Sequence, residues 1–419
     1  MSSRILPPSG PPRVLALAQL TNAFGDGAYY VCSALYFTRI VGLSPTQVGF
    51  ALTLGWALGS VAGVPLGHLA DRWGARGAAA LLAVATGVAA GSFLFVTSFA
   101  LFVLAACLYT CCQCGLGAAR QALLAGLVDK ARRTEVRAHL QATVNAGLAI
   151  GAALGGLALH LDTRQAYLAV FAMDALSFLA SALVLLRLPA VPPSPPAPAG
   201  EPVLAVLRDR PYALISLLNM IMLLHMPLLS LVIPLWIVQR TEAPSWTVSA
   251  LLVLNTLSVV LFQVRVARRV TGLGTASRSV RQAGLVMLAS CAVFALSAAG
   301  SSAWAAGAAL LVAACLQVLG EMMHASGAWE VGFDLAPQDR QGQYQGFFGA
   351  GTAVARMLGP LLLTTLIITW GPPGWLLLGG LFLLAGSAMG PAVRWAERTR
   401  AAGSPRPAVA PPLPQESAS

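Results

Sequence analysis

The sequence predicts an all-α integral membrane protein with twelve transmembrane helices divided into two halves of six. Three observations support this fold class. The 419 residues are 57% hydrophobic and only 10% charged, with a mean hydropathy of +0.74, which is far too apolar for a soluble protein of this length. Apolar segments of about 20 residues or more, enough to cross a bilayer, recur along the whole chain. A Pro-rich stretch interrupts them near the middle.

The predicted crossings follow one another with short connections. They are residues 14–39, 46–68, 77–97, 99–127, 138–161, 165–187, 211–238, 246–267, 282–300, 303–330, 343–370 and 374–394. The first is too long for the apolar core of a signal peptide, and no small-residue cleavage site follows it. We therefore expect it to remain as the first membrane helix.

Composition divides the chain into five parts. Residues 188–203 are rich in proline, which cannot continue a helix. Beyond Trp395 the chain is rich in Pro, Ser and Ala, a composition typical of disorder. We predict an N-terminal tail at 1–13, a six-helix bundle at 14–187, a linker at 188–210, a second six-helix bundle at 211–395 and a disordered tail at 396–419.

The charge distribution predicts the orientation in the membrane. The net charge is +11. If the N-terminus is cytoplasmic, only Arg39, Arg164 and Arg240 face outside, Arg356 lies within a helix, and every other Lys and Arg lies on the cytoplasmic side. This positive-inside pattern predicts cytoplasmic termini and linker, and it explains the charge without a nucleic-acid partner. The preference for Arg over Lys and the abundance of Ala favour a bacterial inner (plasma) membrane.

The first predicted crossing contains Asp26, flanked by Gly25 and Gly27. A carboxyl group in the middle of a membrane helix costs about 2.5–3.5 kcal/mol on the insertion scale. Asp26 therefore has either a packed polar partner or a functional role, and both interpretations remain open. The flanking glycines allow another backbone to approach closely.

The connection between the second and third crossings reads Gly67-His68-Leu69-Ala70-Asp71-Arg72-Trp73-Gly74-Ala75-Arg76. It resembles the G-x-L-a-D-r-x-G-r-r motif of the major facilitator superfamily, which in that family lies in the cytoplasmic loop between helices 2 and 3. The resemblance implies the fold of that family, two pseudo-symmetric six-helix bundles around a central cavity. It also implies a conformational-switch role for Gly67, Asp71, Arg72, Gly74 and Arg76. We expect Asp71 to approach the start of the eleventh helix near Gln343 and Tyr344, where free N–H groups favour an anion.

The fourth and fifth crossings differ in how closely they follow motifs of this superfamily. In the fourth, Cys111 stands where many relatives carry the Arg of an R-x-x-x-G motif, and Arg120 lies about 13 Å nearer the cytoplasm. Residues 147–156 of the fifth resemble the g-x-x-x-G-P-x-x-G-G motif of the drug/proton antiporter branch, with Ala152 in place of Pro. This resemblance favours export. The glycines expected to line one face for close packing are Gly147, Gly151, Gly155 and Gly156.

The second half of the chain repeats the first at an offset of about 204 residues. Gly147 falls on Gly351, and Leu154-Gly155-Gly156 falls on Leu358-Gly359-Pro360. Such parallel repeats are typical of this fold. Residues 266–272, the counterpart of the 67–76 motif, contain no Asp, so we expect the motif contact on one side only. In the family the sixth helix is peripheral, so we interpret Asp174 as structural.

Four ionisable residues lie at a common depth. Asp26, His225, Glu321 and Arg356 are each about 20 Å from the predicted cytoplasmic end of their helix, at 1.5 Å per residue. Ionisable groups at such depth are functional candidates, particularly where they can pair. We predict an ion pair between Glu321 and Arg356. The candidate proton carriers are Asp26, Glu321, His225 and His324, although each His also fits a packed residue.

The predicted function is secondary active transport by alternating access. The antiporter-like motif and the scarcity of Asn, Gln and Trp in the crossings favour proton-coupled efflux of a small, largely apolar compound such as a drug or natural product. Uptake of a small metabolite is the alternative, and a membrane-embedded enzyme is a remote one. We expect substrate, protons and the lipid bilayer as partners, no metal, cofactor or nucleic acid, and a monomer. The seven Cys lie in apolar segments and are interpreted as packing residues.

Overall fold

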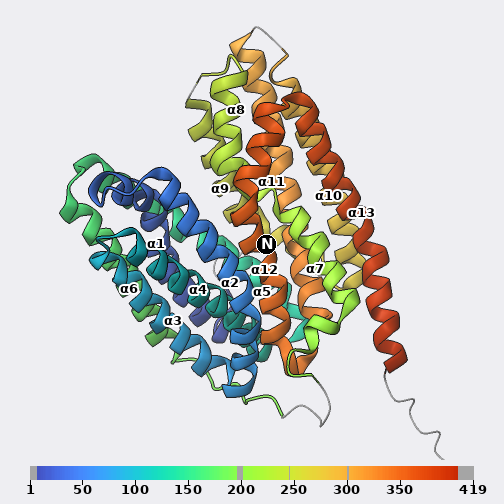
Figure 1. Ribbon diagram of the computed structural model, residues 1–419. Helices are drawn as coiled ribbons and strands as arrows, with labels where there is room; N and C mark the ends of the chain where they lie inside the picture. Colours follow the sequence, from blue (N-terminus) through green and yellow to red (C-terminus); the bar gives the residue numbers. More distant parts are fainter. Residues whose placement is uncertain (1–6, 196–201, 245, 300–301, 404–419) are drawn as a thin grey trace, which may run out of the picture.

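The computed structural model describes residues 7–195, 202–244, 246–299 and 302–403. These residues form two bundles of helices (Figure 1). The first bundle contains α1 (Pro11–Leu35, continued by a π-helical turn Tyr36–Ile40), α2 (Pro45–Trp73), α3 (Ala75–Ser92), α4 (Phe99–Leu127), α5 (Arg133–Leu161) and α6 (Arg164–Leu185). The second contains α7 (Arg210–Leu223), α8 (Ile233–Arg240), α9 (Trp246–Ala267), α10 (Leu273–Leu296), α11 (Ala303–Asp334), α12 (Gln341–Leu363) and α13 (Pro372–Gly403).

Eleven helical spans in the described residues are long and apolar enough to cross a membrane. The remaining predicted crossing corresponds to α1, which is not among them and contains Gln19, Asn22 and Asp26. A count of twelve crossings therefore stays a prediction. The predicted seventh crossing consists of α7 and α8, because the helix is interrupted at His225, just before Pro227. Proline lacks the N–H that would continue the hydrogen-bond ladder.

The last helix is longer than the sequence predicted. Residues 396–403 were expected to begin a disordered tail, but they continue α13 to Gly403. Ala396 is buried against the second bundle, and the Arg400 guanidinium donates to the Asp209 carboxylate at 3.2 Å. Residues 396–402 are mostly Ala, Arg and Glu, which are strong helix formers, and the Pro-rich composition begins only after Gly403. The rest of the predicted tail, 404–419, lies outside the described residues.

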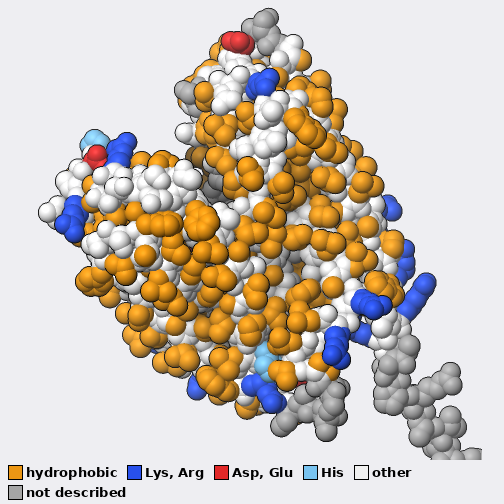
Figure 2. Space-filling model, viewed as in Figure 1, with side chains coloured by type: hydrophobic (Ala, Val, Ile, Leu, Met, Phe, Trp, Pro, Cys, Tyr) orange, Lys and Arg blue, Asp and Glu red, His pale blue; other side chains and the backbone are white. Residues whose placement is uncertain are grey.

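The two bundles join at one end and diverge at the other (Figure 1). We call the end that carries linker residues 188–195 and 202–209 the linker end, and the opposite end, with Asp162 and Arg240, the open end. Figure 2 shows the surface hollowed between the bundles toward the open end. In the described part of the chain, the hydrogen bonds and ion pairs between the bundles lie at the linker end, except for one from Arg356.

Glycines at equivalent positions allow two helices to pack closely inside each bundle. Gly147, Gly151 and Gly155 of α5 lie against α1, where an added Cβ would meet Ala23, Phe24 and Ala28 respectively. In the second bundle, Gly351 of α12 lies against Met220 of α7, and Gly359 lies against Pro227, just after α7. The repeat read from the sequence thus corresponds to equivalent helix contacts. Gly156 differs from the prediction, because nothing lies within 4 Å of the Cβ it would carry.

Candidate functional site

The 67–76 motif lies at the linker end, where α2 meets α12. One Asp71 carboxylate oxygen accepts a hydrogen bond from the backbone N–H of Gly342 at 2.7 Å, and the other accepts from Gln343 at 2.9 Å. The first N–H groups of a helix have no partner within that helix and carry partial positive charge. The expected approach to the start of this helix is confirmed, with Gly342 and Gln343 as donors rather than Tyr344.

Four glycines bring α2 and α12 into backbone contact at the same place. A Cβ on Gly67 would lie 2.6 Å from the carbonyl carbon of Gly342, and a Cβ on Gly346 would lie 2.7 Å from that of Gly63. Real side chains do not tolerate such distances, so the two helices meet here only because these positions have no side chain. We call Gly63, Gly67, Gly342 and Gly346 the glycine contact.

The rest of the motif attaches the linker to the first bundle. Gly74 separates α2 from α3 with φ of 91°, a conformation that favours glycine. The Arg76 guanidinium donates to the Leu188 carbonyl at 3.0 Å, and the Asp71 carbonyl accepts from the Ser194 N–H at 2.8 Å. Arg72 is exposed. The motif therefore contacts the other bundle and the linker at once.

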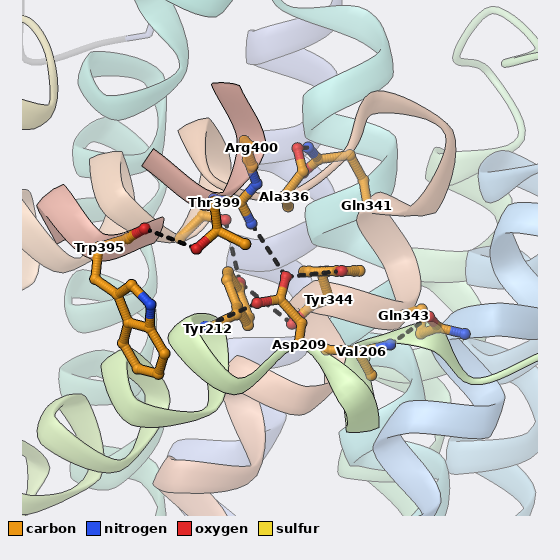
Figure 3. A network of polar contacts seen from close by, with 11 residues as sticks. Val206, Asp209, Tyr212, Ala336, Gln341, Gln343, Tyr344, Trp395, Thr399 and Arg400 are labelled. Atoms are coloured by element: carbon orange, nitrogen blue, oxygen red, sulfur yellow. Dashed lines mark hydrogen bonds and ion pairs between the residues drawn. The ribbon is translucent and has the colours of Figure 1, made fainter. Parts of the chain in front are cut away.

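Figure 3 shows a network of polar contacts around the start of α12, where Asp71 is bound. The Gln343 side chain donates to the Val203 carbonyl at 2.7 Å and accepts from the Val206 N–H at 3.2 Å. Asp209 caps the start of α7 and accepts from the Tyr344 hydroxyl at 3.0 Å as well as from the Arg400 side chain. The start of α12, the linker and the end of α13 are thus held together at the linker end.

A second set of contacts joins α5 to the other bundle. The Arg268 guanidinium, just after α9, donates to the Glu135 carboxylate at 2.8 and 2.9 Å. The Asp contact with a helix start is thus found on one side only among the described residues, as expected, and a different contact, an ion pair, joins the counterpart segment to α5. Further contacts between this region and α11 are Lys130 with Asp334, Thr134 with Glu330, and Arg137 stacked over the Trp329 ring.

Asp26 lies in a polar cluster inside the first bundle. Its carboxylate accepts hydrogen bonds from Asn22 at 2.9 Å, Tyr109 at 3.0 Å and Gln113 at 3.3 Å, and only 8% of the residue is exposed. Arg120 joins the cluster by donating to Asn22 at 2.5 Å. Asp26 was predictable because a charge in an apolar helix needs a partner, whereas its donors Tyr109 and Gln113 on α4 were not, because an uncharged side chain in an apolar helix carries no such requirement.

Asp174 of α6 lies beside this cluster and is fully buried. A Cβ on Gly25 would lie 2.8 Å from its Cα, so α6 packs closely on α1 and places Asp174 inside the bundle. Neither carboxyl oxygen has a hydrogen-bond partner among the described residues. Burying a lone negative charge is costly, so an uncharged side chain of similar shape should fit this position.

We expect Asp174→Asn to be tolerated. An amide is close in shape to a neutral carboxyl group, so thermal stability in detergent should change by less than about 1 kcal/mol. The measurement is the midpoint of thermal unfolding of purified protein, with Asp26→Asn as the comparison because its carboxylate has three donors. A loss above about 3 kcal/mol in Asp174→Asn would mean that a charged or strongly bonded carboxylate is required there.

The second bundle contains a separate histidine cluster. His324 Nε2 lies 3.1 Å from the Asn219 side-chain oxygen, and the rings of His324 and His225 are 5.8 Å apart. Both histidines are buried. Glu321, one turn before His324, accepts from the Asn255 side chain at 3.0 Å. These predicted site residues therefore face α7 and α9 rather than Asp26.

The predicted ion pair between Glu321 and Arg356 is not present among the described residues. Glu321 faces Asn255, whereas Arg356 points to the first bundle and donates to the Tyr30 hydroxyl at 3.3 Å. Its guanidinium also lies 4.8 Å from the centre of the Trp56 ring. Equal depth places two residues at one level but says nothing about the direction in which each leaves its helix.

Comparisons with known proteins agree with this architecture. The family model described as Major Facilitator Superfamily matches residues 15–360. The structure is similar to that of the human organic anion transporter MFSD10 (TETRAN), with a TM-score of 0.71 at 17% identity, covering 91% of this chain and 100% of that one. It is also similar to a bacterial homologue of the iron transporter ferroportin in an outward-facing state with soaked iron, with a TM-score of 0.70 at 15% identity, covering 93% and 99%. No curated protein matches the sequence. At these identities the structural likeness shows the fold alone.

Proposed function

The chain belongs to the major facilitator superfamily, and from that premise we propose that it is a secondary active transporter that couples proton movement to efflux of a small, largely apolar compound. One observation carries the alternating-access part of this proposal. The bundles are joined at the linker end by the Asp71 hydrogen bonds, the glycine contact and the Glu135–Arg268 ion pair, and they separate at the open end. Breaking these contacts while the open end closes would expose the cleft to the other side.

The positive-inside pattern supports a cytoplasmic linker end. With that orientation the arrangement is the outward-facing state, and the linker end is the closed cytoplasmic gate. We propose Asp26 as the proton carrier. Its three hydrogen bonds stabilise the ionised carboxylate, and burial stabilises the neutral acid. A change in packing between α1 and α4 would therefore change its affinity for a proton.

The test is transport in inverted membrane vesicles, whose lumen corresponds to the outside of the cell. We expect a panel of fluorescent, largely apolar compounds to accumulate when the lumen is acidified. Collapsing the proton gradient with a protonophore should abolish the accumulation. Accumulation that is unchanged by the protonophore would contradict proton coupling.

Uptake by the same fold is the second candidate. The observation that favours it is the cleft open toward the end opposite the linker (Figure 2), which is where an importer collects its substrate. Right-side-out vesicles with an acidic exterior separate the two functions. Uptake predicts accumulation in these vesicles, whereas efflux predicts accumulation only in inverted ones.

A further inference from the structure

Arg356 places a positive charge between the two bundles without a direct ion-pair partner among the described residues. It lies in the middle of α12 and is partly buried. Asp26 is close enough for the two charges to interact. The Asp26 carboxylate, however, is already bonded to Asn22, Tyr109 and Gln113.

The surroundings of this guanidinium are aromatic and come from the other bundle. Its central carbon lies 4.8 Å from the Trp56 ring of α2 and 5.8 Å from the Tyr30 ring of α1. The only hydrogen bond it makes among the described residues is the one to the Tyr30 hydroxyl, and Tyr30 is 44% exposed. A guanidinium has five N–H donors. Most of its hydrogen-bonding capacity is therefore free.

Open space lies next to this group on the same face of α12. Gly349 precedes Arg356 by seven residues, about two helical turns, so both lie on nearly the same side of the helix. Gly349 is exposed, and nothing lies within 4 Å of the Cβ it would carry. Gly346, one turn nearer the linker end, is already in contact with Gly63. Side chains of a helix lean toward its N-terminus, so Arg356 leans over the space above the glycine contact.

We propose that this space binds an organic anion: the guanidinium of Arg356 receives a carboxylate or a comparable oxyanion, and the Trp56 and Tyr30 rings contact the apolar body of the compound. A guanidinium binds planar oxyanions through two parallel hydrogen bonds. A charged group at this depth that has no acidic ion-pair partner among the described residues is a binding-site candidate. The proposal rests on the transporter function proposed above and specifies the substrate as a largely apolar body with one negative charge.

The test uses three probes that differ only in charge, which are 1-naphthoate, neutral 1-naphthamide and cationic 1-naphthylmethylammonium. Binding of each radiolabelled compound to the purified transporter in detergent is measured by equilibrium dialysis. The wild-type protein should bind 1-naphthoate at least about tenfold more tightly than the amide, and the ammonium compound most weakly. Equal affinities for acid and amide, or no binding of 1-naphthoate, would overturn the proposal.

Variants test whether Arg356 causes the preference for the acid over the amide. Arg356→Gln should bring the affinities for acid and amide to within about twofold of each other. The matched control is Arg265→Gln, because Arg265 is an exposed arginine stacked on Phe262 of its own helix, and it should leave the preference intact. If Arg356→Gln does not fold, Arg356→Lys decides, because losing the planar fork should weaken 1-naphthoate several-fold and leave the amide unchanged.

Binding in detergent needs neither a proton gradient nor a direction of transport. An intact anion preference without proton-driven accumulation would overturn the proposed function and leave this inference standing. Proton-driven accumulation together with an unchanged preference in Arg356→Gln would overturn the inference and leave the function standing.

Discussion

Gly346→Val is expected to abolish transport while the protein remains folded. A Cβ at this position would lie 2.7 Å from the carbonyl carbon of Gly63 and 3.2 Å from the Cα of Val64. Both belong to the backbone of α2, which cannot move aside as a flexible side chain could. The clash exists only while the linker end is closed, so the variant should occupy the state in which α2 and α12 are apart. A transporter held in one state cannot complete its cycle.

The matched control is Gly380→Val. This position lies inside α13, away from the α2–α12 contact and from the space beside Arg356, and nothing lies within 4 Å of its added Cβ. The same substitution there should retain most of the transport rate, so any general effect of replacing a helical glycine by valine is measured separately. Initial transport rates in vesicles give the comparison. Similar rates for both variants would show that the glycine contact is not part of the cycle.

The state of each variant is measured by cross-linking. Thr134 contacts the far end of the Glu330 side chain across the linker end, so Thr134→Cys with Glu330→Cys should be joined by a short bifunctional thiol reagent when that end is closed. The pair is introduced into a transporting background whose seven native cysteines are replaced. We expect efficient cross-linking with Gly380→Val and little with Gly346→Val. Efficient cross-linking with Gly346→Val would mean that the helices still meet despite the added side chain.

Apolar length predicted where the helices lie, but only in some cases where they begin and end. The bounds of α4 and α9 agree with the predicted crossings 99–127 and 246–267. In contrast, α5 begins at Arg133 rather than 138, and α10 begins at Leu273 rather than 282. Hydropathy locates the part of a helix that contacts lipid. A helix extends beyond the membrane wherever its backbone bonds continue and its polar side chains find partners, as Glu135 does with Arg268.

The contacts of the site residues were also predictable only in part. The Asp71 contact was predictable, because a motif specifies both a residue and its partner. The partners of Arg356 were not, because counting residues gives depth along a helix and leaves the direction of the side chain undetermined. Asp174 was interpreted as structural from the peripheral place of its helix. Its oxygens lie beside Gly25 inside the bundle because a glycine there lets α6 approach α1 closely. The spacing of residues within one helix cannot predict how closely a second helix packs against it.

Asp26→Asn is expected to abolish proton-driven accumulation while substrate binding is retained. An asparagine keeps the size of the side chain but cannot take up and release a proton. Its amide oxygen can still accept from Tyr109, so the cluster should remain folded, although its NH2 group would face the Asn22 side chain that now donates. Accumulation in inverted vesicles with an acidified lumen should therefore fall to the level seen with a protonophore. Exchange of labelled for unlabelled compound without a gradient should continue, because that reaction requires the cleft to alternate but no net proton movement.

The control for this variant is Asp174→Asn, which removes the other buried carboxyl group of the same bundle. It should keep accumulation near the wild-type level, since Asp174 has no donors among the described residues. Accumulation by Asp26→Asn against a gradient would reject Asp26 as the carrier. If Asp174→Asn then loses accumulation, the carrier is Asp174. If both variants still accumulate substrate, Glu321 becomes the remaining acid at this depth, and Glu321→Gln should be the variant that exchanges without accumulating.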